Sequence, residues 1–153
     1  MSVEAFLDTN VLIYAVSSSP AEAAKKEKAL ELIEYTDFGL SAQVLQEFYV
    51  NVTRKIALPL SPDDAMALLE QFRCFPMVLT DYPLIVAGTE AALRFGISYW
   101  DGTIMAAAEF LGATTLYTED LNHGQTYGSV QAVNPFLSGA TDSVHDEGGP
   151  RYG

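Results

Sequence analysis

The hydrophobic positions of the chain fall into short runs without helical spacing, separated by stretches in which apolar residues recur every three or four positions. The short runs are mainly apolar and of strand length, which predicts five β-strands at residues 3–7, 38–40, 77–79, 114–117 and 130–133. The stretches between them predict helices at residues 11–14, 21–35, 41–56, from 61 onward, 82–95 and 101–111. Strands and helices therefore alternate along the chain.

Residues at the predicted helix ends support this division. Ser41 and Ser61 stand where an N-cap is needed, and Pro62 occupies the first helical position after Ser61. Gly96 and Gly112 follow the last apolar residues of two helices, where glycine commonly ends a helix. Short strands that alternate with helices are typical of a parallel sheet covered by helices on both faces. We therefore expect an α/β fold.

Four acidic residues that are far apart in the sequence fall near one edge of such a sheet. Asp8 directly follows the first strand, and Asp120 follows the strand at 114–117 by a few residues. Asp101 begins the helix that leads into that strand, and Glu47 lies two turns into the helix after the second strand. Ligands of open parallel sheets bind beyond the carboxyl ends of the strands. We therefore expect the four carboxylates to converge.

Converging carboxylates repel one another unless cations lie between them. Mg²⁺ and Mn²⁺ prefer oxygen ligands, and a carboxylate cluster that holds them can activate water and stabilise the leaving oxygen of a phosphodiester. The His and Cys spacing of a zinc site is missing from the sequence. Local sequence leaves other roles open: Asp8 as a helix cap, Asp101 as a favourable charge at a helix start, and Glu119 in place of Asp120.

Composition narrows the class of protein. The 153 residues are 49% hydrophobic and 18% charged, which indicates one folded domain. A formal net charge of −12 argues against a surface that binds nucleic acid through many phosphate contacts, and favours a metal site or a basic protein partner. The single cysteine forms no internal disulfide, no apolar run approaches the ~20 residues of a membrane span, and no signal peptide is evident. We expect a cytoplasmic protein without membrane attachment.

Four segments around these acids, taken in order, resemble the PIN-domain family and, within it, the VapC-type toxins of toxin–antitoxin pairs. The segments are FLDTNVL at 6–12, SAQVLQEFY at 41–49, YWD at 99–101 with AAA at 106–108, and LYTEDL at 116–121. The resemblance covers about residues 3–135. Each segment alone is a weak signal, whereas their order and spacing together are specific.

The resemblance implies a three-layer α/β/α sandwich with a five-stranded parallel sheet, and endonucleolytic cleavage of RNA that depends on Mg²⁺ or Mn²⁺. It assigns the catalytic, metal-binding positions to Asp8, Glu47, Asp101 and Asp120. Polar residues that support these ligands by hydrogen bonding would be Thr9, Asn10, Thr118 and Glu119. The chain departs from the family at Gly102, where Ala or Ser is more frequent, and at His123-Gly124, where many members have Asp-Phe.

The same resemblance implies partners. VapC-type proteins form dimers and are held inactive by an antitoxin, so we expect a homodimer and an antitoxin whose basic segment is attracted to the acidic edge. Apolar residues in excess of what a small sheet covers would supply an interface, unless all of them belong to the core; they are Tyr14, Leu30, Ile33, Phe48 and Tyr49.

Two further expectations concern the substrate and the domain boundary. Arg54 lies seven residues after Glu47, about two turns along one helix face, and is our candidate for guiding an RNA phosphate toward the acids. Residues 1–138 are expected to form the PIN-like nuclease domain. The Gly-, Ser- and Asp-containing stretch at residues 139–153 is expected to be a disordered acidic tail.

Two other functions fit parts of the pattern. A catalytically inactive PIN scaffold that acts as a binding module would usually lose carboxylates, and here all four are present. A phosphoryl-transfer or phosphatase α/β domain also carries aspartates at strand ends. The haloacid dehalogenase type needs Asp-x-Asp after the first strand, where this chain has Asp8-Thr9-Asn10, and a receiver domain needs a late lysine, whereas none follows Lys55. The ribonuclease interpretation is therefore preferred.

Overall fold

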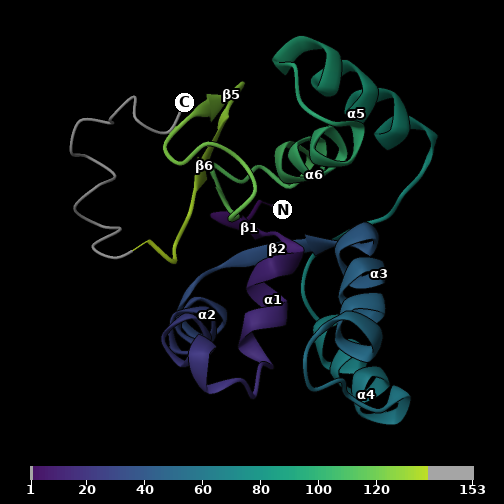
Figure 1. The fold of residues 1–153 in the computed structure, drawn as a ribbon. Helices are drawn as coiled ribbons and strands as arrows, with labels where there is room; N and C mark the ends of the chain where they lie inside the picture. Colours follow the sequence, from purple (N-terminus) through teal and green to yellow (C-terminus); the bar gives the residue numbers. More distant parts are fainter. Residues whose placement is uncertain (1, 138–153) are drawn as a thin grey trace.

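A computed structural model of the chain describes residues 2–137, and its centre is a six-stranded sheet (Figure 1). The strand order is β3-β2-β1-β4-β6-β5. The strands are β1 (Ala5–Leu7), β2 (Phe38–Ser41), β3 (Met77–Val78), β4 (Thr115–Tyr117), β5 (Thr126–Tyr127) and β6 (Val130–Val133). All neighbouring strands are parallel except β5, which pairs antiparallel with β6. The predicted α/β class is confirmed, with one strand more than the five expected.

The additional strand β5 belongs to a tight hairpin at the edge of the sheet. Tyr127 pairs with Val130, so that only Gly128 and Ser129 form the turn. Gly128 has a φ of 64°, a left-handed conformation that glycine adopts without the steric cost of a Cβ. A strand of two residues with a single apolar side chain is too short to produce an alternating pattern. The sheet therefore has one short antiparallel strand in addition to the five parallel strands that were expected.

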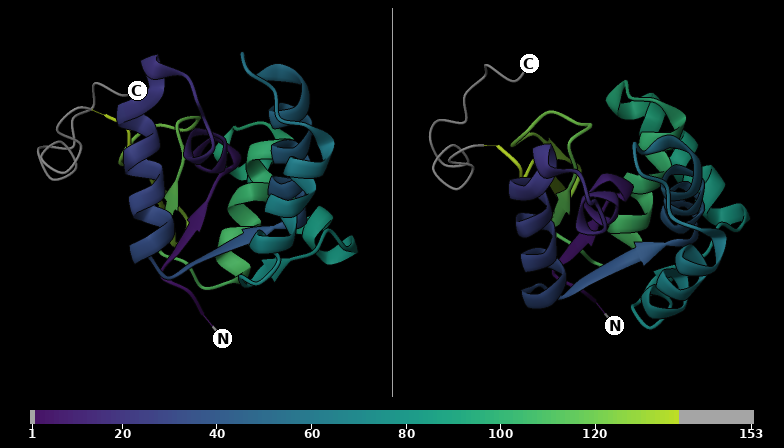
Figure 2. Two further views of the ribbon diagram at one scale, coloured as in Figure 1. Left: turned by 90° about the horizontal axis from the view of Figure 1, so that it is seen from below. Right: turned by 60° about the horizontal axis from the view of Figure 1, so that its bottom comes forward.

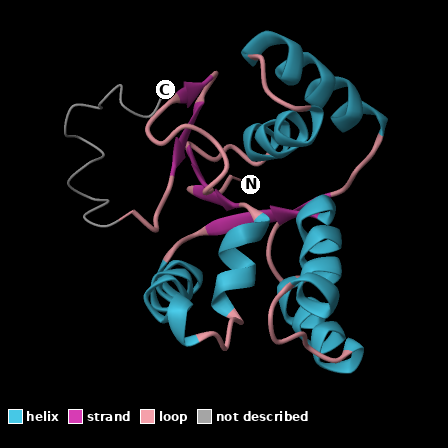
Figure 3. Ribbon diagram, in the orientation of Figure 1, coloured by secondary structure: helices cyan, strands magenta, loops and turns pink. Residues whose placement is uncertain are grey.

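Helices cover both faces of the sheet, which confirms the predicted α/β/α layering (Figures 1 and 3). On one face lie α1 (Thr9–Ala15), α2 (Ala23–Tyr35), α3 (Ala42–Val50) and α4 (Pro62–Phe72); on the other lie α5 (Tyr82–Phe95) and α6 (Tyr99–Phe110). A 3₁₀ turn (Pro20–Glu22) precedes α2, and a π-helical turn (Asn51–Lys55) continues α3. Both views of Figure 2 show α1 packed beside α2, and α3 beside α4 on the right side of the molecule.

Side chains cap most of these helices. Ser41 accepts a hydrogen bond from the Val44 amide, and Ser61 accepts one from the Asp64 amide, as their positions predicted. Helix α5 ends at Gly96, whose φ is 67°. Helix α6 begins two residues earlier than predicted, because Ser98 is its N-cap and accepts from the Asp101 amide. Asp101 therefore lies in the first turn of α6 rather than at its start.

Glycine allows α5 and α6 to pack very closely. A Cβ added at Gly102 would collide with the backbone oxygen of Gly88, and one added at Gly88 would collide with the side chain of Thr103. Glycine at position 102, where the PIN-domain family more often has Ala or Ser, thus allows the two helices to pack closely. This contact holds the first turn of α6, with Asp101, against α5.

The core lies between the sheet and its helices, and includes Phe6, Leu40 and Leu116, all fully buried. Phe48 is also fully buried, so the expectation that it contributes to an exposed interface was wrong. Leu30 is 46% exposed, and Tyr14, Ile33 and Tyr49 are half-buried. Residues 139–153, predicted to be a tail, lie outside the described residues. Within residues 2–137, no helix has the length and apolar character to cross a membrane.

Candidate active site

The four acidic residues come from four different elements near the carboxyl ends of the central strands. Asp8 follows β1 and extends its pairing, because its amide donates to the Tyr117 carbonyl at the end of β4. Glu47 lies on α3, Asp101 on α6, and Asp120 in the loop after β4. Their charges act on one another: Glu47 and Asp120 raise the pKa of Asp8, and Glu47 also raises the pKa of Asp101 and of Asp120. The structure therefore brings these acids together.

Asp8 is the most deeply placed acid, with 5% of its surface exposed. Its Oδ1 accepts from the Thr9 amide at 2.7 Å, and its Oδ2 accepts from the Thr118 hydroxyl at 2.7 Å. Burial nevertheless outweighs these hydrogen bonds and raises the pKa of Asp8 to about 7, and the charges of Asp120 and Glu47 act in the same direction. Without a cation, this carboxyl group is held in an environment that disfavours its charge.

Glu47 is held from two sides. The Thr9 hydroxyl donates to its Oε1 at 2.7 Å, and the Gln43 side-chain amide donates to its Oε2 at 3.2 Å. Gln43 is itself buried, and its carbonyl oxygen accepts from the Thr103 hydroxyl at 2.5 Å. The Gln43 amide also lies 3.4 Å from the carbonyl oxygen of Trp100. Glu47 is thus connected through Gln43 to the first turns of α6.

Sequence analysis missed Gln43 and Thr103. The signal for Gln43 is its spacing, since it precedes Glu47 by four residues and so lies on the same face of α3. Thr103 has no comparable signal, because its contact joins two helices that are distant in sequence.

Asp101 and Asp120 have fewer partners. The amide of Asp101 donates to Ser98, and partial burial together with the charge of Glu47 raises the pKa of its carboxyl group. The Asp120 side chain accepts one long hydrogen bond, 3.4 Å from the Asn10 amide nitrogen. The pKa of Asp120 is raised chiefly by partial burial, then by the charges of Asp101, Glu119 and Glu47.

Thr118 links Asp8 to the loop that carries Asp120. Its hydroxyl donates to Asp8 and accepts from the backbone amide of Asp120 at 3.0 Å. A single buried side chain therefore fixes the loop that carries Asp120 relative to Asp8.

Glu119 has a different environment from Asp120. One of its oxygens accepts from the Tyr14 hydroxyl at 2.9 Å, and the other lies 2.8 Å from the Lys25 ammonium nitrogen. The hydrogen bond to Glu119 raises the pKa of Lys25 to about 12. Both oxygens of Glu119 are therefore engaged by α1 and α2, whereas Asp120 is exposed.

Two further residues named from the sequence lie elsewhere. Arg54 is exposed in the π-helical turn after α3. His123 is buried, and its Nδ1 accepts from the Asn134 amide at 2.9 Å, which fastens the loop after β4 to the end of the described chain.

The donor chemistry of the site fits a hard divalent cation. Four carboxylates gather here, and the ion pairs found within residues 2–137 involve none of them: these are Lys25–Glu119, Lys28–Glu31 and Arg73–Glu70. The side-chain oxygen of Asn10 is buried beside the site without a hydrogen-bond partner. In the described part of the chain, no group of three or more His, Cys, Asp or Glu side chains is placed so that it could hold a metal ion by itself. Mg²⁺ suits such a site because it retains several waters.

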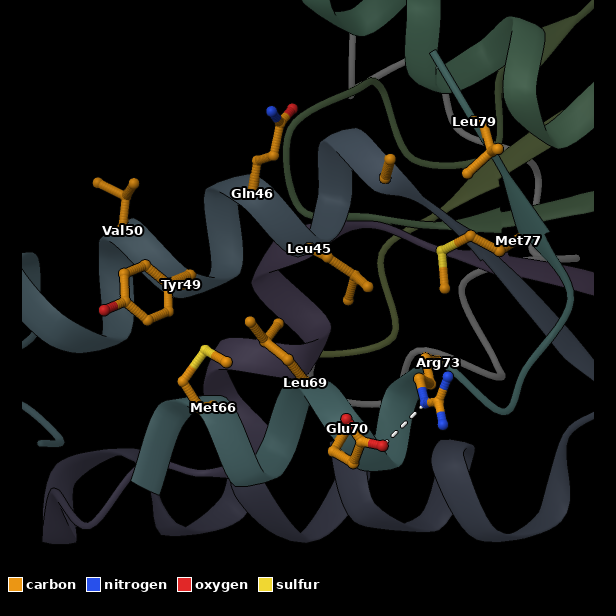
Figure 4. Close-up of a pocket in the computed structure, with 11 residues that line it drawn as sticks. Leu45, Gln46, Tyr49, Val50, Met66, Leu69, Glu70, Arg73, Met77 and Leu79 are labelled. Carbon is orange, nitrogen blue, oxygen red and sulfur yellow. Dashed lines mark ion pairs between the residues drawn. The ribbon is translucent and has the colours of Figure 1, made fainter. Parts of the chain in front are cut away.

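A concave feature lies beside α3, away from the four acids. It is an apolar groove of about 650 Å³ between α3, α4 and β3 (Figure 4). Its apolar lining includes Leu45, Met66, Leu69 and Met77. The ion pair between Glu70 and Arg73 lies at the side of the groove. The four carboxylates do not line this groove.

Comparisons with known proteins agree with this architecture. The model of the PIN domain family matches residues 5–128. Three solved structures illustrate the likeness. VapC20 of Mycobacterium tuberculosis, a sarcin–ricin loop cleaving toxin, is 19% identical, with 76% of this chain and 90% of that chain covered and a TM-score of 0.62. A toxin–antitoxin complex from Klebsiella pneumoniae is 15% identical, with 88% of this chain and 100% of that chain covered and a TM-score of 0.64. FitAcB from Neisseria gonorrhoeae is 23% identical, with 88% of this chain and 99% of that chain covered and a TM-score of 0.59.

At these identities, the likeness to solved structures shows the fold. No curated protein matches the chain. The family assignment therefore rests on the model match over most of the chain, and the residue roles rest on the geometry of the site.

Proposed function

Because the chain belongs to the PIN domain family, we propose that it is a metal-dependent endoribonuclease and the toxin of a type II toxin–antitoxin pair. The observation that carries this proposal is the set of four interacting carboxylates, which lack Lys or Arg ion-pair partners within residues 2–137 and lie at the carboxyl edge of the sheet. Two of the structural relatives are named as a toxin and a toxin–antitoxin complex, which supports the toxin role.

In this proposal, Asp8, Glu47, Asp101 and Asp120 hold Mg²⁺ or Mn²⁺. The bound cation supplies the positive charge that activates water and stabilises the leaving oxygen of an RNA phosphodiester. Thr9, Thr118 and Gln43 keep the carboxylates of Asp8 and Glu47 in place by hydrogen bonds. Asn10 holds Asp120 loosely and places an unpaired oxygen beside it.

The direct test is cleavage of RNA by the purified full chain with and without metal. We expect cleavage with Mg²⁺ or Mn²⁺, its loss in excess EDTA, and its return when metal is restored. Activity that survives EDTA would remove metal from the proposal. Metal binding without any cleavage would instead favour the inactive-scaffold function.

RNA binding is expected to depend on few ionic contacts, because the chain has only eight Lys and Arg residues and a net charge of −12. We propose Arg54, exposed beyond the end of α3, as one phosphate contact. Replacing Arg54 by Gln should weaken RNA binding. It should also reduce by about one the number of ions released on binding, which is measured from the slope of log affinity against log salt concentration. A steep salt dependence in the unmodified protein would contradict this.

We also propose that the chain forms a homodimer in the cytoplasm and binds an antitoxin through a basic segment that competes with Mg²⁺. The acidic site attracts such a segment, and the apolar groove beside α3 offers surface for protein contact (Figure 4). The exposed free thiol of Cys74 suits a reducing compartment. Sedimentation that shows only monomer at micromolar concentration would overturn the dimer. If the affinity of a basic peptide for the protein does not change with Mg²⁺ concentration, the proposed competition is wrong.

A further inference from the structure

Trp100 is a large aromatic residue, exposed to water, whose backbone adjoins that of Asp101. It is 63% exposed, and it directly precedes Asp101 in the first turn of α6. It is the only tryptophan of the chain. Removing an indole ring from water is strongly favourable, so an exposed tryptophan next to reactive groups indicates a binding role.

The backbone of Trp100 is fixed relative to the acids. Its carbonyl oxygen lies 3.4 Å from the Gln43 amide that also holds Glu47, and 2.8 Å from the Thr103 hydroxyl. The indole ring meets the Tyr99 ring edge-on, with centroids 4.9 Å apart. The polar network that positions Glu47 therefore also positions Trp100, while most of the ring surface stays accessible.

The net negative charge of the protein favours uncharged contacts with RNA. A chain with a net charge of −12 gains little affinity from phosphates, whereas stacking of a base on an aromatic ring does not depend on charge. Only an unpaired base exposes a face that can stack in this way.

We propose that Trp100 is a stacking platform for an unpaired base of the RNA, adjacent to the phosphate that the acidic site cleaves. This inference rests on the proposed ribonuclease function and adds to it a residue that contacts the substrate; a base can stack on the ring only where the RNA is unpaired. Neighbouring residues on a helix point about 100° apart, so a base on Trp100 would lie alongside Asp101 rather than on top of it.

The chain offers a direct optical test, because Trp100 is its only tryptophan, and excitation at wavelengths that tyrosine does not absorb reports on this residue alone. The probe is a short labelled single-stranded RNA of mixed sequence, compared with the fully paired duplex of the same strand. Asp8→Asn in the full chain serves as the non-cleaving background, and RNA binding is followed independently by the anisotropy of the label. We expect the single strand to quench Trp100 in step with binding, and the duplex to bind more weakly with little quenching.

Variants in the same background then measure the contribution of the ring. Trp100→Ala should weaken single-strand binding on the order of tenfold, and Trp100→Phe should retain most of it. Phe110→Ala is the matched control, since Phe110 is 53% exposed at the opposite end of α6, and it should leave binding unchanged. Thermal unfolding checks that the exposed positions tolerate the changes.

The outcomes separate this inference from the proposed function. If the unmodified protein cleaves RNA while Trp100→Ala binds and cleaves equally well, the stacking platform is wrong and the nuclease stands. If Trp100→Ala instead changes the sedimentation of the protein without changing RNA affinity, the ring belongs to a protein interface and the inference is also wrong. If the unmodified protein neither binds nor cleaves RNA, both fall together.

Discussion

The acidic site consists of two unlike halves. The inner pair, Asp8 and Glu47, accepts hydrogen bonds on every carboxylate oxygen from threonine, glutamine and backbone donors. Within residues 2–137, the carboxylates of the outer pair, Asp101 and Asp120, have fewer contacts: a hydrogen bond with the Ser98 side chain for Asp101, and the 3.4 Å contact with Asn10 for Asp120. The inner pair is therefore fixed by the fold itself, whereas the outer pair can adjust when a cation and a substrate arrive.

The deep burial of Asp8 has a cost in stability. A buried carboxyl group without a cation destabilises the folded chain once it is ionised. The close packing at Gly88 and Gly102 and the cap at Ser98 hold α6 in place while leaving the Asp101 carboxylate half-exposed. Function therefore strains Asp8 most, and substitution should reveal this.

The largest expected effect comes from removing a carboxylate from either half. Asp8→Asn and Asp101→Asn should each lower cleavage by on the order of a thousandfold, because both remove a negative ligand from the cation. Their effects on stability should differ: in metal-free buffer Asp8→Asn should raise the melting temperature clearly, and Asp101→Asn only slightly. Equal stabilisation by the two substitutions would contradict the distinction between inner and outer acids. Full cleavage activity in both variants would show that neither residue takes part in the mechanism.

The next effect concerns pH. The pKa of Asp8 is about 7 in the folded chain and near its ordinary value of 3.8 when unfolded, so between these values the folded state holds a proton that the unfolded state has lost. Stability of the metal-free protein should therefore fall as pH rises from about 4 to about 7, by roughly 2–4 kcal/mol. The raised pKa values of Asp101 and Asp120 act in the same direction.

Urea unfolding in EDTA at acidic and at slightly alkaline pH measures this change. Asp8→Asn should remove most of it, and saturating Mg²⁺ should reverse its sign because the cation binds the ionised form. A metal-free protein that gains stability over this pH range would show that Asp8 ionises freely in the fold.

The sequence was sufficient for the parts of the site that depend on element order. Strand ends and helix starts place Asp8, Glu47, Asp101 and Asp120 at one edge, because parallel strands share a carboxyl end. Caps such as Ser41 and Ser61 were predictable because they depend on neighbouring residues.

Features that depend on contacts between distant elements were not predictable. The bridge from Thr103 through Gln43 to Glu47 joins two helices that the sequence does not relate. The side-chain partners of Glu119 could not be seen either, since Tyr14 and Lys25 lie on other helices. The burial of Phe48 was missed because the sequence does not show which residues α4 covers; its ring packs edge-on against Phe72.

A smaller effect should follow from loosening the inner pair without removing an acid. Gln43→Ala removes the amide that holds Glu47, and we expect the affinity for Mn²⁺ to fall about tenfold. Gln46→Ala on the same helix is the matched control, since Gln46 is exposed and faces the apolar groove. Asn10→Ala should have less effect than Gln43→Ala, because its contact with Asp120 is longer. Calorimetric titration with Mn²⁺ distinguishes these cases, and equal losses in all three variants would indicate a general structural effect.

The smallest effect is expected at Glu119, which neighbours an outer acid but is bound to other partners. Glu119→Gln and Lys25→Met each break an ion pair that is partly exposed, with 40% of the Lys25 side chain and 25% of the Glu119 side chain in water. Stability should fall by no more than about 1 kcal/mol. Cleavage should stay within a few-fold of the unmodified protein, because Glu119 donates no charge to the cation in our assignment, whereas Asp120→Asn should lose activity almost completely. Parallel measurement of initial cleavage rates for Glu119→Gln and Asp120→Asn decides between the two residues. The reverse ranking, with Glu119→Gln inactive and Asp120→Asn active, would make Glu119 the fourth ligand and would require the Lys25 and Tyr14 contacts to open when metal binds.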